Sequence, residues 1–326
     1  MQCFSRRQIA GYVSALPLVL LGSGATAQAY PAKLVKVIVP YGPGTVSDAT
    51  ARLMAERLSE YWGVAVVVEN QTGAGGVLGT QAIARAVPDG YTLGMLSSNH
   101  AINAALYPNL PYDPVKDFKP ILHTTFNQFA FCVNPALPVQ TLQELLALAK
   151  ARPGEIAYSS SGNGGSPHLA VAKLAYMANV QLTHVPYKTN GAGVIDLISG
   201  QVALMATSVS VLAPHVKAGK LRALAVSGDS RSSLLPNVPT VNEAGVPGYS
   251  MVNWNGFVGP AGLSSAIVSK LQSDMTAVLK EQRSSDRIAA MGAEIEILAS
   301  DDFERKLRTE IGLWTRIVKT AGVKMD

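Results

Sequence analysis

Two patterns of apolar and polar positions alternate along the chain. Continuously apolar runs at 35–40, 64–70 and 92–98 predict buried β-strands. Between them, the segments 47–62 and 77–86 repeat their apolar residues at helical spacing. The resulting β-α-β-α-β order, with strands that are apolar on both faces, predicts a mostly parallel sheet covered by helices on both sides.

The same alternation restarts in the second part of the chain. Strands are expected at 129–135, 156–161, 182–187, 201–207 and 221–228, and helices at 141–151, 166–179, 191–200 and 210–219. The stretch 229–263 is rich in Pro and Gly and predicts connections and edge structure. Two helical patterns, 264–280 and 300–322, close the chain. With 326 residues, the chain is expected to form two α/β domains.

The N-terminus has the pattern of an export signal. Arg6 and Arg7 precede a mostly apolar segment at 9–21, and the small-residue sequence 27–29 offers an A-x-A cleavage site. We therefore expect residues 1–29 to be a signal peptide that is cleaved, by either the Sec or the twin-arginine route. The mature protein is then expected to be periplasmic.

The net charge and the cysteine content limit which binding partners and which disulfides are expected. Removing two of the 27 basic residues with the signal peptide leaves 22 acidic ones and a net charge of about +3. No basic run exists, so nucleic acid is not expected as a partner. Cys132 would be the only cysteine left, and between Phe131 and Val133 it reads as a small buried hydrophobe in a strand.

The sequence lacks the common motifs of enzymes. There is no G-x-S-x-G, no G-x-x-x-x-G-K-[ST] and no H-E-x-x-H, and the five histidines form no i,i+4 pair. We therefore expect no catalytic residues, no cofactor and no metal. An exported hydrolase would need a nucleophile and a base, for which Ser161 and His168 are the only nearby candidates.

Polar turns follow several of the predicted strands and are the candidate ligand-binding segments. Ligands of open α/β sheets bind beyond the carboxyl ends of the strands, where helix N-termini offer free N–H groups and a partial positive charge. Simple helix capping by Ser47, Asp48 or Ser166 is the alternative interpretation of these turns. The candidate residues are Tyr41, Gly44, Thr45, Val46, Ser47 and Asp48, then Ser97 and Asn99, then Ser160, Ser161, Gly162, Asn163, Ser166 and His168, and finally Thr207 and Ser208.

Several longer stretches in fixed order resemble one family. Among them are VIVPYGPGTVSDATARLMAERLSEYWGVAVVVENQTGAGGVLG, NAALYPNLPYDPVKDFKPI, YSSSGNGGSPHLA, HVPYKTNGAGVIDLISGQV and PNVPTVNEAGVPGY. They resemble the Bug/TctC family of periplasmic substrate-binding proteins of tripartite tricarboxylate transporters, from about residue 30 to the C-terminus. The resemblance implies a two-domain, periplasmic-binding-protein (Venus flytrap) architecture, a carboxylate ligand in the cleft and membrane permease subunits as partners. It also implies that the loops 41–48 and 160–168 hold the ligand carboxylate, partly through water.

The resemblance further implies a discontinuous first domain. We expect domain 1 at 30–127 plus 252–326 and domain 2 at 128–251, in a monomer. A sensor module that signals to a membrane partner would use the same binding chemistry and stays open as an alternative.

Two departures from the family's usual sequence bear on the ligand. The first loop has Thr45 and Val46 where glycines are common, and Ala203 and Thr207 replace two acidic residues. An unpaired buried carboxylate beside an anionic ligand would be costly. If position 207 faces the cleft, its neutral side chain favours a dicarboxylate or an aromatic carboxylate over an amino acid.

Overall fold

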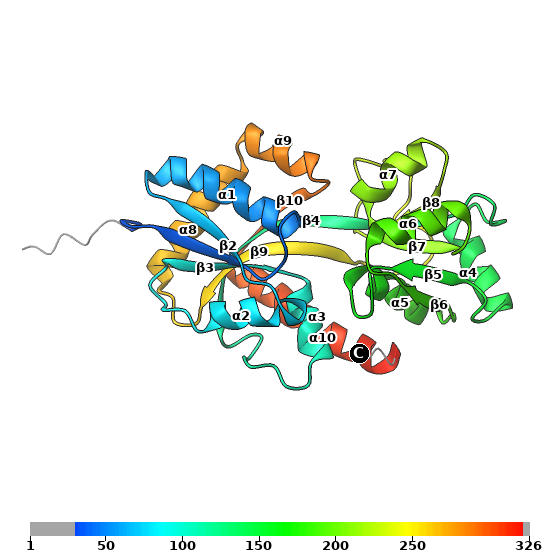
Figure 1. Ribbon diagram of the computed structural model, residues 1–326, viewed down its shortest axis with the longest axis horizontal. Coiled ribbons are helices and arrows are strands. Elements are labelled where there is room, and N and C mark those ends of the chain that lie inside the picture. The colour runs from blue at the N-terminus through cyan, green and yellow to red at the C-terminus, as the bar shows by residue number, and fades with distance from the viewer. Residues whose placement is uncertain (1–29, 322–326) are drawn as a thin grey trace, which may run out of the picture.

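The computed structural model describes residues 30–321. The expected signal peptide at 1–29 and residues 322–326 lie outside the described residues. Figure 1 shows two α/β domains side by side, joined by two long strands, β4 and β9. Domain 1 carries β1–β3, β9, β10 and the first part of β4, and domain 2 carries the rest of β4 and β5–β8.

The domain 1 sheet has the order β2-β1-β3-β9-β4, with β10 also on β4. Its strands are β1 (Val35–Val39), β2 (Val66–Asn70), β3 (Thr92–Ser97), β4 (Phe118–Val133), β9 (Val252–Pro260) and β10 (Glu294–Ala299). The first three are parallel, as their apolar runs predict, whereas β9, β4 and β10 add antiparallel pairs. The sheet is therefore mixed.

Helices cover both faces of this sheet. One face holds α1 (Val46–Trp62), α8 (Ser265–Leu279) and α9 (Gln282–Ala290). The other holds α2 (Val77–Ala84), α3 (Asn99–Leu106) and α10 (Ser300–Ala321). Thr45 begins α1 as its N-cap, and Gly63 ends it at φ 69°, a conformation that glycine adopts without strain.

Domain 2 repeats the layered design around the order β4-β7-β5-β6, with β8 also on β4. Its strands are β5 (Ala157–Ser160), β6 (Thr183–Pro186), β7 (Leu204–Ser208) and β8 (Arg222–Val226). The helices α4 (Leu142–Ala151) and α5 (Ser166–Ala178) cover one face, and α6 (Asn190–Ser199) and α7 (Val209–Lys217) the other. Cys132 is fully buried on β4, as the sequence indicates.

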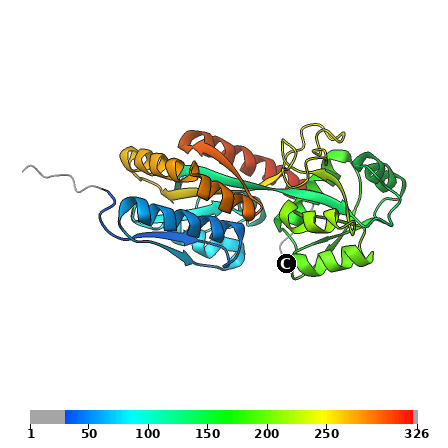
Figure 2. The ribbon, with the colours of Figure 1, turned by 90° about the horizontal axis from the view of Figure 1, so that it is seen from above.

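One strand belongs to both sheets. Residues 118–128 of β4 pair with β9 in domain 1, and residues 129–133 pair with β7 and β8 in domain 2. Figure 2 shows β4 running from one domain into the other. The prediction for 229–263 was wrong at its end, because Val252–Pro260 forms a central strand, not a connection.

Candidate functional site

The carboxyl ends of neighbouring parallel strands bring the predicted turns together within each domain. In domain 1, β1 and β3 are parallel neighbours, so α1 and α3 begin at the same edge of the sheet. In domain 2, β5 and β7 are parallel neighbours, so α5 and α7 also begin side by side. Each domain therefore presents the N-termini of two helices at one sheet edge.

These two edges meet at a direct contact between the domains. The hydroxyl of Ser166, at the start of α5, donates to Oδ1 of Asn99, at the start of α3, over 3.0 Å. A second contact lies at Gly292, between α9 and β10, where an added Cβ would lie 2.1 Å from Cβ of Ser210 on α7. The structure thus brings Asn99 and Ser166 together, and the two domains touch at both places.

The first predicted loop is organised by its own capping groups. The Thr45 hydroxyl accepts from the Asp48 N–H (3.2 Å) and donates to the Gly42 carbonyl (3.0 Å). Gly44, at φ 80°, donates its N–H to Asp48 Oδ2 over 2.9 Å. The loop therefore has a fixed shape.

Asp48 is a charged group that is already paired. Burial alone would raise the pKa of Asp48, but hydrogen bonds from Arg52, the Gly44 N–H and Asn70 outweigh it and hold the pKa below its usual range. The carboxylate is thus ionised and neutralised by Arg52 at 3.0 Å. Its observed role is to support the loop, and since the N-cap of α1 is Thr45, Asp48 does not cap the helix.

The other residues of this segment face the protein interior. The Tyr41 hydroxyl accepts from the Ser97 N–H over 3.2 Å, and the Ser97 hydroxyl accepts from the Asn99 N–H over 3.3 Å. Val46 packs against the core under α1. Ser47 is buried and donates to Asn255 Oδ1 over 2.5 Å. Tyr41 and Ser97 therefore link the β1 and β3 turns to each other.

The second predicted loop, at 160–168, lies around a pair of histidines. Ser160 Oγ and His184 Nε2 are 2.6 Å apart, and the Gly164 N–H donates to Nδ1 of His168 over 3.1 Å. The two imidazole rings stack with their centroids 3.8 Å apart. Burial, with a smaller contribution from His184, lowers the pKa of His168 to about 4, so the ring is neutral. His168 thus shapes the loop that leads into α5.

The start of α5 itself has free hydrogen-bonding capacity. Its N-cap is Gly165, which supplies no side-chain cap, and Gly162 at φ 118° and Gly164 at φ 70° turn the chain into the helix. Ser161 and Asn163 lie in the same turn. The first N–H groups of a 13-residue helix are consequently available to an anion.

The last predicted pair lies at the end of β7. Thr207 is buried, at 1% exposure, and Ser208 precedes α7 with its hydroxyl 2.9 Å from that of Ser210. Since Ser210 also adjoins Gly292 of domain 1, this turn reaches the domain junction.

Sequence reasoning missed the polar residues on the strands that join the domains. Asn255 bonds Ser47 and donates to Thr125 Oγ1 over 3.2 Å, while Asn253 accepts from Ser98 and donates to Asn127 over 3.4 Å. These asparagines tie the turns after β1 and β3 to β4. The only signal was the pair of asparagines in VNWNG, within the stretch taken as a connection.

Two other kinds of functional feature were looked for in the described part of the chain, a metal site and a membrane-spanning helix. Within residues 30–321, no group of three or more His, Cys, Asp or Glu side chains is placed to hold a metal ion. No helix in the same range is long and apolar enough to cross a membrane.

The comparison with known families decides the class of protein. The family described as "Tripartite tricarboxylate transporter family receptor" (TctC) matches residues 50–323. The chain belongs to this family. Protein BugT of Bordetella pertussis is 34% identical over 302 residues, which cover 92% of this chain and 93% of BugT. Members of the family are solute-binding proteins, so the exported hydrolase is set aside.

Solved structures agree with this membership. A protein of R. palustris solved with adipate is 33% identical with a TM-score of 0.76, covering 90% of this chain and 99% of that one. MatC from Rhodopseudomonas palustris, solved with bound malate, is 29% identical with a TM-score of 0.73, covering 89% and 100%. The expected family and the two-domain periplasmic-binding-protein fold are thus confirmed.

Proposed function

We propose that this protein captures a small organic carboxylate between its two domains and delivers it to the membrane subunits of a tripartite tricarboxylate-type transporter. Family membership supports the transport role, and the relatives solved with adipate and malate support the ligand class. We further propose that it acts in the periplasm as a monomer, after cleavage of residues 1–29. N-terminal sequencing of the exported protein tests the cleavage.

The contact between Asn99 and Ser166 carries the proposal. It brings the beginnings of α3 and α5 together from opposite domains, at the edges where α1 and α7 also begin. Helix N-termini bind anions through backbone N–H groups and the helix dipole. None of the 16 candidate residues is a lysine or arginine, so we assign recognition of the carboxylate to these N–H groups and to neutral side chains.

Closure of the domains is the step that retains the ligand. A ligand that touches both domains binds the closed state better than the open state, and this difference in affinity shifts the equilibrium toward closure. The proposed contacts come from the loops 41–48 and 160–168, partly through water.

Thr207 underlies the proposed ligand preference. A neutral side chain at the end of β7 leaves no carboxylate to repel a second anionic group or to pair with an ammonium group. We therefore propose that dicarboxylates and aromatic carboxylates bind better than amino acids.

Calorimetric titration with matched ligands tests this proposal. Glutarate and glutamate differ by one ammonium group, and adipate, malate and benzoate extend the series. We expect glutarate to bind at least tenfold more tightly than glutamate. We expect a Thr207→Asp variant to lose most of that preference, and Thr207→Val to keep it. Binding of glutamate together with no binding of any other ligand in the series would contradict the proposal.

A further inference from the structure

The side chain of His168 is bonded to the turn that precedes its own helix. Helix α5 begins at Ser166, so His168 is the third residue of the first helical turn. Its Nδ1 accepts the Gly164 N–H over 3.1 Å, one residue before the N-cap Gly165. A capping box is built similarly, since a side chain of the first turn there accepts the backbone N–H of the N-cap residue. His168 therefore fixes the direction in which the chain enters α5.

This hydrogen bond determines where the hydrogen of the imidazole ring lies. A ring nitrogen that accepts a hydrogen bond carries no hydrogen, so His168 is neutral with its N–H at Nε2. The surroundings favour that neutral form, because the ring is buried and stacks on His184. The two rings line a groove between α5 and β6, and none of the described residues that line it is Asp, Glu, Lys or Arg. An imidazolium ion would therefore gain no carboxylate partner from them.

The ring of His168 faces its own domain. All the described residues that line this groove lie between positions 154 and 184, in domain 2. The contact with domain 1 is made instead by Ser166, whose hydroxyl donates to Asn99 of α3. The bond to Gly164 is thus the link between the His168 side chain and the turn that faces domain 1.

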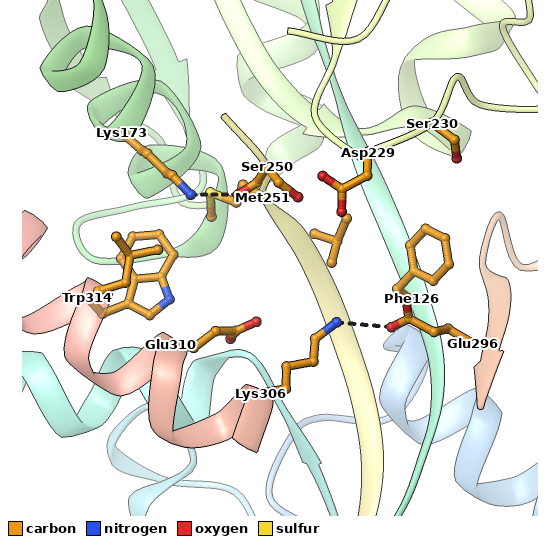
Figure 3. A pocket seen from close by; sticks show the side chains of 12 residues that line it. Phe126, Lys173, Asp229, Ser230, Ser250, Met251, Glu296, Lys306, Glu310 and Trp314 are labelled. Carbon is orange, nitrogen blue, oxygen red and sulfur yellow. Dashed lines mark hydrogen bonds and ion pairs between the residues drawn. The ribbon is translucent and has the colours of Figure 1, made fainter. Parts of the chain in front are cut away.

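The backbone N–H groups at the start of α5 are the donors that this turn can direct. Pro167 has no N–H, so Ser166 and His168 carry the first two N–H groups of the helix. Within residues 166–178, Lys173 is the only Lys or Arg. Figure 3 shows its ammonium group in a pocket farther along α5, where it donates to the Ser250 carbonyl over 2.5 Å. An anion at the start of α5 is therefore held by N–H groups, and their direction matters.

We propose that His168 is a positioning residue of the carboxylate site: its Nδ1 holds Gly164 so that the N–H groups at the start of α5 point toward the ligand, and its ring does not touch the ligand. The inference rests on the proposed function and changes the role of a residue that the sequence placed among the ligand contacts. Ser160 supports the same turn, because its hydroxyl accepts the Gly162 N–H over 3.1 Å and lies 2.6 Å from His184 Nε2.

Two substitutions of His168 separate the acceptor from the ring. His168→Asn keeps an acceptor, Oδ1, at the position of Nδ1 but loses the ring. His168→Phe keeps a ring that can stack on His184 but loses the acceptor. In calorimetric titrations at pH 7, we expect the Phe variant to bind adipate about tenfold more weakly than the wild type, because the Gly164 N–H is left without its acceptor. We expect the Asn variant to bind within about threefold of the wild type.

Exchange of the Gly164 amide hydrogen is a second measurement, and it needs no ligand. It is followed by NMR on the ¹⁵N-labelled, ligand-free protein. We expect exchange about tenfold faster in His168→Phe and nearly unchanged in His168→Asn. His215→Phe makes the same substitution in the last turn of α7 and is the control, for which we expect no change in affinity or exchange. Thermal unfolding confirms that the variants are folded.

The pattern across the two variants decides the inference. Loss of affinity in the folded Asn variant would overturn it, because the ring itself would then be needed for binding. Wild-type affinity in the Phe variant would also overturn it, because the acceptor would then be dispensable. If His168→Phe does not fold, His168→Asn alone decides between these roles. Absence of adipate binding in every protein, together with the expected change in Gly164 exchange, would instead refute the proposed function and leave the support of the turn standing.

Discussion

At the scale of single residues, Gly292 shows how closely the domains approach. It has φ 72°, a region that favours glycine, and it leaves no room for a side chain beside Ser210. Its sequence neighbourhood gives no sign of this role, because the contact joins two segments about 80 positions apart. Gly292 is therefore a point at which the two domains meet although it carries no side chain.

We predict that Gly292→Ala favours the open state. The added methyl group would lie 2.1 Å from Cβ of Ser210 in this structure, and a separation of the two domains would relieve that clash. The affinity for adipate, measured by calorimetry, should fall at least tenfold. The radius of gyration of the ligand-free protein, measured by small-angle X-ray scattering, should rise.

Gly219→Ala is the matched control for this prediction. Gly219 has nearly the same φ, 69°, and has open space around an added Cβ. Both variants should lose about 1 kcal/mol of stability from backbone strain. Equal affinities in the two variants would show that the contact with Ser210 does not control closure.

At the scale of elements, the regular apolar runs were sufficient to predict most of the α/β units. The strands β1, β3 and β5 and the helices α1, α4 and α5 lie where the sequence pattern predicts them. Their strands are apolar and their helices are amphipathic, so local pattern and tertiary burial agree.

The helices and strands that were not predicted contain residues that fit their element only because of tertiary contacts. Strand β9 contains Gly256 because the Phe303 ring of α10 passes where a Cβ would lie, 2.5 Å from Phe303 Cζ. It contains Asn255 because Ser47 and Thr125 satisfy that side chain. Both residues disfavour a strand in isolation. Helix α9 was missed because it is short and polar. Strand β10 has the alternation EIEIL that is typical of a strand, so its omission was a wrong interpretation of the pattern and not a lack of signal.

The same reasoning explains the outcome at the candidate site. The sequence located the turns that precede α1, α5 and α7, whereas helix α3 was not expected at 99–106. It also could not show that Asp48 is paired with Arg52 or that His168 bonds Gly164. Those contacts depend on rotamers and loop shape. The assignment of ligand contacts to the candidate residues stays a prediction for the titrations above.

At the scale of the whole molecule, buried neutral histidines couple stability to pH. Burial lowers the pKa to about 4 for His100 and for His123, and burial with His184 does so for His168. The unfolded chain, with a pKa near 6.5, binds more protons between these values. Stability is therefore fully present above pH 6.5 and is lost as the pH falls toward 4, by about 1.4 kcal/mol per pH unit for each histidine.

We predict that His100→Gln weakens this dependence. Its amide can still donate to the Pro114 carbonyl, which His100 Nε2 contacts at 2.7 Å, but it does not titrate. Urea unfolding at pH 7 and pH 5 should show a smaller loss of stability in the variant than in the wild type. An identical loss would mean that His100 is not neutral in the folded state.

The shared strand β4 has a consequence for how the gene can be divided. The chain leaves domain 1 after Gln128 and returns at Val252, and these two residues are opposite one another in the antiparallel β4–β9 pair. An Asn-Gly dipeptide in place of residues 129–251 would turn the two strands into an ordinary β-hairpin. We predict that this shortened chain folds, with a cooperative thermal transition and dispersed amide signals in NMR. Domain 2 would then be a removable insertion, and an unfolded product would show instead that domain 1 needs it.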